Sequence, residues 1–136
     1  MDLVMRLRTV ELIFFAALFV TVTPVMAHCQ AAGNPYIEGD YQGDCDEATE
    51  LAQGKGQASG ADSYDGYFVQ GRPDGKGTYK WANGARLEGT FKSGKAHGAG
   101  VYISAKGVRY EGQFLDGKFG TLKPEDCPVT PGPLTC

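Results

Sequence analysis

Aromatic residues and glycines alternate with polar residues in three short stretches of the chain. These stretches are YDGYF from Tyr64, LEGTF from Leu87 and YEGQF from Tyr110, and their starts are 23 residues apart. Within each stretch the first, third and fifth residues recur with a period of two, which places them on one face of a β-strand. The pattern therefore predicts short strands that each have one apolar face.

A second strand pattern follows each of the first two stretches. The sequences are GKGTY from Gly75 and GAGVY from Gly98, again with a period of two. The sequence GRPDG at 71–75 predicts the turn inside the unit, and the Asn-Gly pair at 83–84 is typical of a hairpin turn. Because a lone hairpin is only marginally stable in water, we expect the units to stack. The predicted fold is all-β, a single-layer antiparallel sheet of stacked β-hairpins.

The residues that recur on the apolar face are expected to form the core of this sheet. Repeat units bury their periodic residues against the neighbouring units. An alternative is that some rings of this face are exposed and bind a ligand. The predicted core residues are Tyr64, Phe68, Tyr79, Phe91, Tyr110 and Phe114.

The 23-residue unit resembles the MORN repeat, whose pattern is similar to Y-x-G-x-F-x-x-G-x-x-x-G-x-G-x-Y. Residues 64–86 fit it closely, 87–109 fit it except for the leading leucine, and 110–120 fit only its first half. Within the segment 28–63, the sequence YQGDC from Tyr41 is similar to a degenerate earlier copy. The resemblance implies a hairpin array that acts as a scaffold or accessory domain. It also implies an association with protein or membrane-lipid binding.

Residues 1–27 have the pattern of a secretory signal peptide. Two arginines precede an apolar run, and a small-residue site ends at Ala27, after which cleavage is expected. The true start is Met1 or Met5. A membrane anchor is the alternative, but the apolar run is shorter than the about 20 residues that span a bilayer. We therefore expect a helical signal and a secreted or periplasmic product, similar to an exported bacterial-type MORN repeat protein.

The chain has four cysteines, and all of them follow the expected cleavage site. In an exported protein an even number indicates two disulfides, for which three connectivities are open. The alternative of a zinc site is disfavoured because the spacings of 16 and 9 residues contain no close ligand pair. The segment 121–136 is rich in proline and is expected to cap the last hairpin. The disulfide candidates are Cys29, Cys45, Cys127 and Cys136.

Charge is unevenly distributed along the chain. Residues 28–63 contain one lysine and seven acidic residues, whereas 64–120 contain nine basic and five acidic residues. The repeat sheet is therefore a candidate surface for an anionic lipid headgroup or an envelope glycan. The candidate binding residues are Arg72, Lys80, Trp81, Arg86, Lys92, Lys95, Tyr102 and Arg109, with the Tyr79 ring beside them.

The sequence lacks the common catalytic patterns. It has no G-x-S-x-G, no H-E-x-x-H and no G-x-G-x-x-G that opens a helix. We therefore expect a non-enzymatic protein that needs no cofactor or metal, and nucleic acid is not an expected partner of an exported acidic chain. The main hypothesis is a protein-interaction module with a protein partner in the cell envelope. The recurring acids at 65, 88 and 111 are expected to face solvent or to pair across strands with Arg86 and Arg109.

Overall fold

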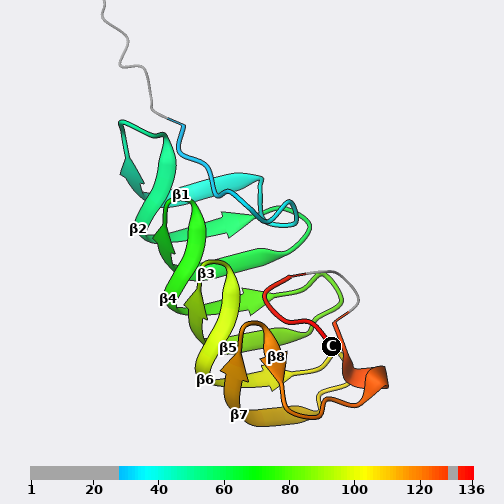
Figure 1. The fold of residues 1–136 in the computed structure, drawn as a ribbon. Helices are drawn as coiled ribbons and strands as arrows, with labels where there is room; N and C mark the ends of the chain where they lie inside the picture. Colours follow the sequence, from blue (N-terminus) through cyan, green and yellow to red (C-terminus); the bar gives the residue numbers. More distant parts are fainter. Residues whose placement is uncertain (1–27, 129–131) are drawn as a thin grey trace, which may run out of the picture.

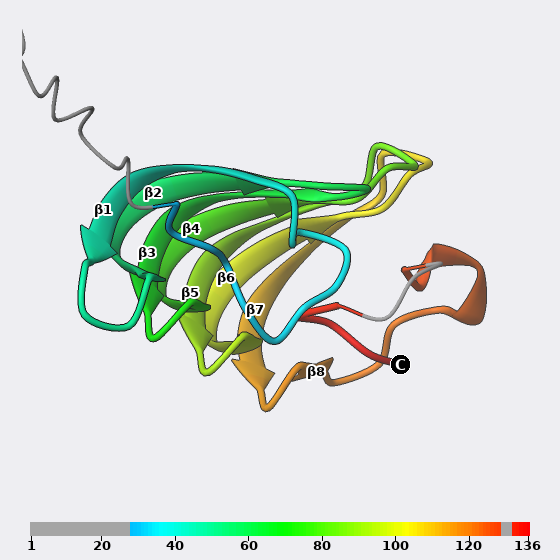
Figure 2. The ribbon, with the colours of Figure 1, turned by 90° about the horizontal axis from the view of Figure 1, so that it is seen from above.

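The fold is known from a computed structural model, which describes residues 28–128 and 132–136. The predicted signal peptide and its cleavage site after Ala27 lie outside the described residues. Within the described part, the chain forms an elongated curved sheet, and the two ends of this part lie on the same side of it (Figure 1, Figure 2). No helix in this part is long and apolar enough to cross a membrane.

Eight antiparallel strands form one open sheet, in which each strand is hydrogen-bonded to the next along the chain. The predicted single-layer sheet of stacked hairpins is therefore confirmed. A short 3-10 helix, η2, follows the last strand. The elements are β1 (Asp40–Asp46), β2 (Leu51–Ser59), β3 (Ser63–Val69), β4 (Arg72–Lys80), β5 (Arg86–Lys92), β6 (Lys95–Ile103), β7 (Arg109–Leu115), β8 (Lys118–Phe119) and η2 (Pro124–Asp126).

The hairpins follow the sequence repeats, including the two incomplete ones. The degenerate copy forms β1 and β2, which pair from Asp40 opposite Ser59 to Asp46 opposite Leu51. The truncated last copy still makes a hairpin, but β8 contains only two residues. The sheet therefore contains four hairpins within the described part, of which the first and last differ most from the pattern.

Two-residue turns connect the strands inside the last three hairpins. Both residues of each turn have positive φ, for example 50° at Gln70 and 81° at Gly71. This is the type I′ geometry, which matches the right-handed twist of the flanking strands. The predicted turn at 71–75 was therefore wrong, because two residues are enough to reverse the chain and β4 already begins at Arg72.

A continuous row of glycines crosses the first seven strands, one glycine opposite the next. At some positions of this row a side chain would collide with a ring: a Cβ atom on Gly77 would lie 2.3 Å from the Tyr64 hydroxyl oxygen. Tyr41 lies over Gly56 in the same way. The missing side chains thus make room for rings of a neighbouring strand. The row consists of Gly43, Gly56, Gly66, Gly77, Gly89, Gly100 and Gly112.

The core lies on the concave side of the sheet, where two segments outside the strands cover it. Figure 2 shows these segments, residues 28–39 and the described residues after β8, on this side. Ile37 and Leu134 from these ends are buried together with the rings of the sheet. Of the six predicted core residues five are buried, while Tyr110 is half-buried and packs against them. The hairpins therefore bury their rings partly against the chain's own ends as well as against each other.

The two disulfides join cysteines that are neighbours in sequence. Cys29 pairs with Cys45, with 5.9 Å between their Cα atoms, and Cys127 pairs with Cys136, with 6.1 Å. The first bond attaches the N-terminal segment to β1, at the position where the next copy has Phe68. The second closes the C-terminal segment on itself. Disulfide-tied ends are thus part of the fold, and the three possible connectivities reduce to one.

Candidate functional site

The rings that were candidates for ligand binding are buried. The relative exposure is 0% for Tyr79, 4% for Trp81 and 1% for Tyr102. The backbone of Gly132 packs against the first two rings, and the Tyr102 hydroxyl donates a 2.7 Å hydrogen bond to the Asp126 carbonyl oxygen. The hypothesis of an exposed aromatic surface was therefore wrong, because the chain ends occupy that surface. Trp81 and Tyr102 belong to the core and not to a binding surface.

Burial keeps the phenol groups of these tyrosines neutral. It raises the pKa of Tyr102 to about 12, and the nearby Asp126 carboxylate adds to the shift. Burial also raises the pKa values of Tyr64 and Tyr79 well above the ordinary value of a tyrosine, with the Asp62 hydrogen bond as the second cause for Tyr79. The neutral hydroxyl groups act as hydrogen-bond donors. Tyr64 donates to the Tyr67 carbonyl oxygen in its own strand, whereas Tyr102 donates to Asp126 in the C-terminal segment.

The six remaining candidate residues are all basic and form two groups near opposite ends of the strands. The turn-edge group consists of Arg72, Lys92 and Lys95, which flank the type I′ turns. Lys92 and Lys95 lie directly opposite each other across their hairpin. All three side chains are exposed, and none takes part in the ion pairs found among residues 28–128 and 132–136. This group therefore presents net positive charge to solvent.

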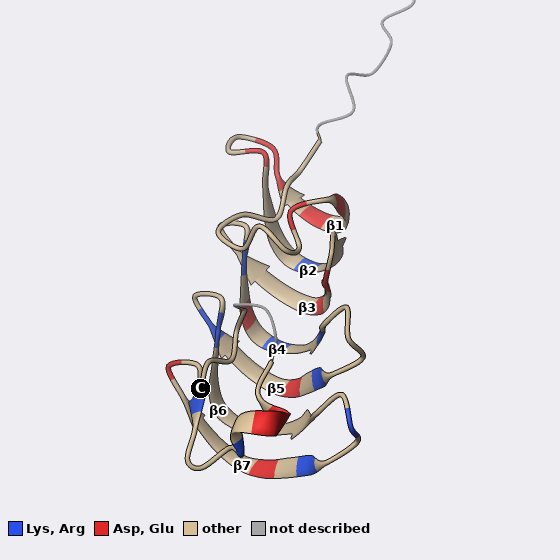
Figure 3. Cartoon of the chain, turned by 90° about the vertical axis from the view of Figure 1, so that its right-hand side faces the viewer, with Lys and Arg blue, Asp and Glu red and all other residues tan. Residues whose placement is uncertain are grey.

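The strand-end group consists of Lys80, Arg86 and Arg109. Lys80 lies opposite Arg86, and the Arg86 Nε atom lies 3.4 Å from Glu88 Oε1. Arg109 pairs in the same way with Glu111. These pairs run along one strand, because side chains two residues apart share a face. The acids at 65, 88 and 111 face solvent, which was one of the two expectations, while Arg86 and Arg109 pair within a strand and not across strands. Figure 3 shows the resulting adjacent acidic and basic positions on β5 and β7.

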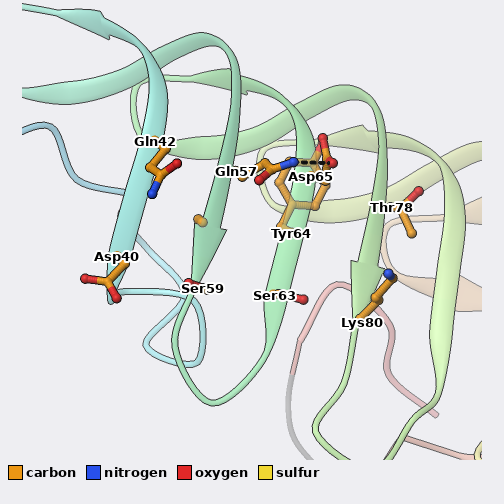
Figure 4. A pocket seen from close by; sticks show the side chains of 10 residues that line it. Asp40, Gln42, Gln57, Ser59, Ser63, Tyr64, Asp65, Thr78 and Lys80 are labelled. Carbon is orange, nitrogen blue, oxygen red and sulfur yellow. Dashed lines mark hydrogen bonds between the residues drawn. The ribbon is translucent and has the colours of Figure 1, made fainter.

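A shallow polar groove crosses the outer face of β1 to β4 (Figure 4). Its volume is about 260 Å3. The Gln57 Nε2 group donates a 2.8 Å hydrogen bond to Asp65 Oδ2 in this groove, and Lys80 lies at its far end. The groove is lined by side chains with hydrogen-bonding groups, mainly Asp40, Gln42, Gln57, Ser59, Ser63, Asp65, Thr78 and Lys80.

Sequence reasoning missed this groove. Its signal was present in the outward residues that alternate with the core positions, because Gln42, Gln57, Asp65 and Thr78 follow one another in register across four strands. Finding it required the register between strands, which the sequence repeat gives only for the complete copies. The groove can bind by hydrogen bonds. In the part of the chain that the structure describes, no group of three His, Cys, Asp or Glu residues could hold a metal ion.

These features define the class of protein: an open, single-sheet array of β-hairpin repeats whose concave face forms its own core. The model of the MORN repeat matches residues 64–86, 88–109 and 110–120. Residues 64–120 therefore consist of MORN repeats, as the sequence pattern indicated. MORN repeats are in general interaction modules and not catalytic units. In a comparison with curated proteins, no match was found.

Proposed function

We propose that the protein is exported and acts, without enzymatic activity, as an interaction module that binds a protein of the cell envelope. The signal-like pattern at 1–27 and the two disulfides support export, since disulfides persist in oxidising compartments. The MORN repeat supports an interaction role. The binding surface in this proposal is the outer face of the sheet, because the concave face is occupied by the chain's own ends.

The observation that carries the proposal is a pair of exposed apolar side chains of β3 on this outer face. Tyr67 is 50% exposed and Val69, two residues further along β3, is 45% exposed. Leu115, which has the position of Val69 two copies later, is 66% exposed. Tyrosine and large aliphatic side chains surrounded by polar ones are typical of the centre of a protein interface. We infer that Tyr67 and Val69 contact the partner directly.

A crosslinking experiment in intact cells tests this function. The tagged protein and the double variant Tyr67→Ser/Val69→Ser are expressed at equal levels, crosslinked before lysis and purified under denaturing conditions. We expect at least one crosslinked envelope protein with the unmodified chain and a loss of about tenfold or more with the double variant, because interface centres carry most of the binding energy.

The matched control is Val108→Ser. Val108 is 42% exposed but lies in the loop between β6 and β7, away from Tyr67 and Val69 on β3. The Val108→Ser variant removes a comparable exposed apolar group outside the proposed contact, so the crosslink should remain intact. Equal crosslinking by all three proteins would exclude Tyr67 and Val69 as the contact.

A second candidate function is binding of an anionic lipid headgroup or an envelope glycan, and the unpaired cations of the turn-edge group favour it. Exposed charges are screened by salt over about 8–10 Å. Binding to vesicles that contain an anionic lipid should therefore weaken when sodium chloride is added. Binding that is unaffected by salt would contradict an electrostatic contact through Arg72, Lys92 and Lys95.

A further inference from the structure

The two covering segments lie along the row of type I′ turns and leave the middle turn between them. The Ala32 N–H group donates a 2.7 Å hydrogen bond to the Gly71 carbonyl oxygen at the first of these turns. The Thr135 N–H group donates one of 2.7 Å to the Gly117 carbonyl oxygen at the third. The turn at Gly94 belongs to the hairpin between these two. The N-terminal segment thus holds one side of it and the C-terminal segment the other.

A cavity of about 470 Å3 opens at this place, and we call it the seam cavity. The N-terminal segment lines it with residues 33–36, the C-terminal segment with Gly132, and the sheet with Arg72 and residues 93–95. Three separate parts of the chain therefore meet around one opening. Its volume lies in the range of about 300–1,000 Å3 that is usual for small-molecule sites.

Positive charge is concentrated at the seam cavity. Arg72 and Lys95 line it, and Lys92 lies opposite Lys95, where the neighbouring copies have Val69 and Leu115. Like charges directly opposite each other in a sheet are destabilising. The carboxylate that reaches this turn, from Asp74, accepts a 3.2 Å hydrogen bond from the Ser93 N–H group. An anion bound by Arg72 and Lys95 would offset the charge of Lys95 and so reduce its repulsion with Lys92.

The side of the cavity formed by the N-terminal segment is fixed to the core. The Asn34 Nδ2 group donates a 3.1 Å hydrogen bond to the buried Tyr79 hydroxyl, and Asn34 Oδ1 accepts one of 3.0 Å from the Tyr36 N–H group. Arg72 lies against Gly33, where a Cβ atom would be 2.8 Å from the guanidinium Nε atom. Asn34 therefore positions Pro35 and Tyr36, and the glycine leaves space for Arg72.

We infer that the seam cavity binds an acidic saccharide, that is, a sugar ring that carries a carboxylate or a phosphate. The half-buried Tyr36 and the Pro35 ring provide an apolar surface for the C–H face of a sugar, and Arg72 and Lys95 provide charge-assisted hydrogen bonds to its anionic group. The inference deepens the second candidate function and is independent of the protein partner. It also gives that function a place in the fold other than the aromatic face.

Titration of the exported, disulfide-bonded protein followed by 15N NMR tests the inference. The probes are glucuronate, glucose 6-phosphate, glucose and inorganic phosphate, each at the same ionic strength. We expect the two acidic sugars to shift the amide signals of Gly33, Ser93 and Gly94. In the variant Arg72→Gln/Lys95→Gln the affinity should fall about tenfold or more, since two charged hydrogen-bond donors are lost. A response to only one acidic sugar supports the site and identifies its anionic group.

The matched control is Lys80→Gln/Arg86→Gln, which removes the same charge from the strand-end group. This variant should change the affinity by less than about twofold, because the two side chains do not line the seam cavity and exposed charges are screened by salt. An equal loss in both double variants would overturn the inference, because it would show a general effect of surface charge. Inorganic phosphate that binds as tightly as glucose 6-phosphate would overturn the contact with a sugar ring. No shift with either acidic sugar would overturn it too, whatever the crosslinking and vesicle experiments show.

Discussion

The hydroxyl of Tyr79 donates a 2.8 Å hydrogen bond to the carboxylate of Asp62, and both side chains are almost completely buried. The other oxygen of this carboxylate accepts a 2.9 Å hydrogen bond from the Ala82 N–H group. Tyr102, one repeat after Tyr79, uses its hydroxyl to bind the Asp126 carbonyl in the C-terminal segment. Two equivalent tyrosines thus hold two different parts of the chain, the loop between β2 and β3 and the C-terminal segment.

The variant Asp62→Ala should therefore lower the free energy of unfolding. It removes the carboxylate that accepts hydrogen bonds from the buried Tyr79 hydroxyl and from the Ala82 N–H group. Each donor that loses its acceptor costs about 1–3 kcal/mol. Guanidinium unfolding followed by the fluorescence of Trp81, the one tryptophan of the chain, measures the loss. Asp65→Ala is the control, because this exposed carboxylate accepts a hydrogen bond from the exposed Gln57 side chain, and we expect a change within about 0.5 kcal/mol.

The raised pKa values of the tyrosines predict a loss of stability in alkali. An unfolded tyrosine ionises near 10.0, whereas Tyr102 in the folded chain does so near 12. Between these values the unfolded state loses protons that the folded state keeps, so the free energy of unfolding falls as the pH rises through this window and is unaffected below it. Guanidinium unfolding at several pH values, followed by circular dichroism, measures the effect. The variant Tyr102→Phe should show a smaller fall, and native tyrosinate absorbance that titrates only at pH 10 would contradict the prediction.

The strands could be predicted from the sequence because their information is local. A period of two sets the inward side chains, and the 23-residue spacing repeats the glycine on every second strand, for example at Gly66 and Gly89. The covering of the concave face could not be predicted in this way. It depends on contacts such as Asn34 with Tyr79, 45 residues apart, and on aperiodic segments that carry no repeat signal. For that reason the sequence left open whether Trp81 was exposed.

The candidate site was predictable only in its charges. The six basic residues are exposed, but the sequence did not separate the turn-edge group from the strand-end group, because that requires knowing which end of each strand a residue occupies. A one-residue error in the turn position changes this assignment, as the predicted turn at 71–75 illustrates. The seam cavity in addition needs both chain ends in place, so no local pattern indicated it.

The glycine row makes a prediction about packing. Gly77→Ala would place a Cβ atom 2.3 Å from the Tyr64 hydroxyl oxygen and 2.5 Å from its ring. The ring cannot move away without losing its contacts with Phe68 and Phe91, at centroid distances of 5.0 and 5.1 Å. We expect a loss of about 1–3 kcal/mol, as for other overpacked cores.

Gly120→Ala is the control for this substitution. A Cβ atom on Gly120 meets nothing within 4 Å, and the residue does not have a φ angle that favours glycine. Thermal unfolding of both variants beside the unmodified protein measures the difference. Equal stability of Gly77→Ala and Gly120→Ala would show that the tyrosine ring does not need the glycine row.

The last prediction concerns the two disulfides. Removing either one should lower stability by a similar amount, but each removal should free a different segment. Cys29–Cys45 encloses a sequence separation of 16 residues and Cys127–Cys136 one of 9, so the loss of loop-closure entropy corresponds to about 3 and about 2.5 kcal/mol respectively. Replacing either pair by serine should therefore lower stability by similar amounts.

The two replacements should free different sides of the seam cavity. Loss of the first bond frees the segment that carries Gly33 and Asn34, and loss of the second frees the segment that carries Gly132. Amide hydrogen exchange of each double-serine variant measures this, with faster exchange expected at Ala32 in the first variant and at Thr135 in the second. Faster exchange at both residues in both variants would instead indicate that the two ends cover the sheet as one cooperative unit.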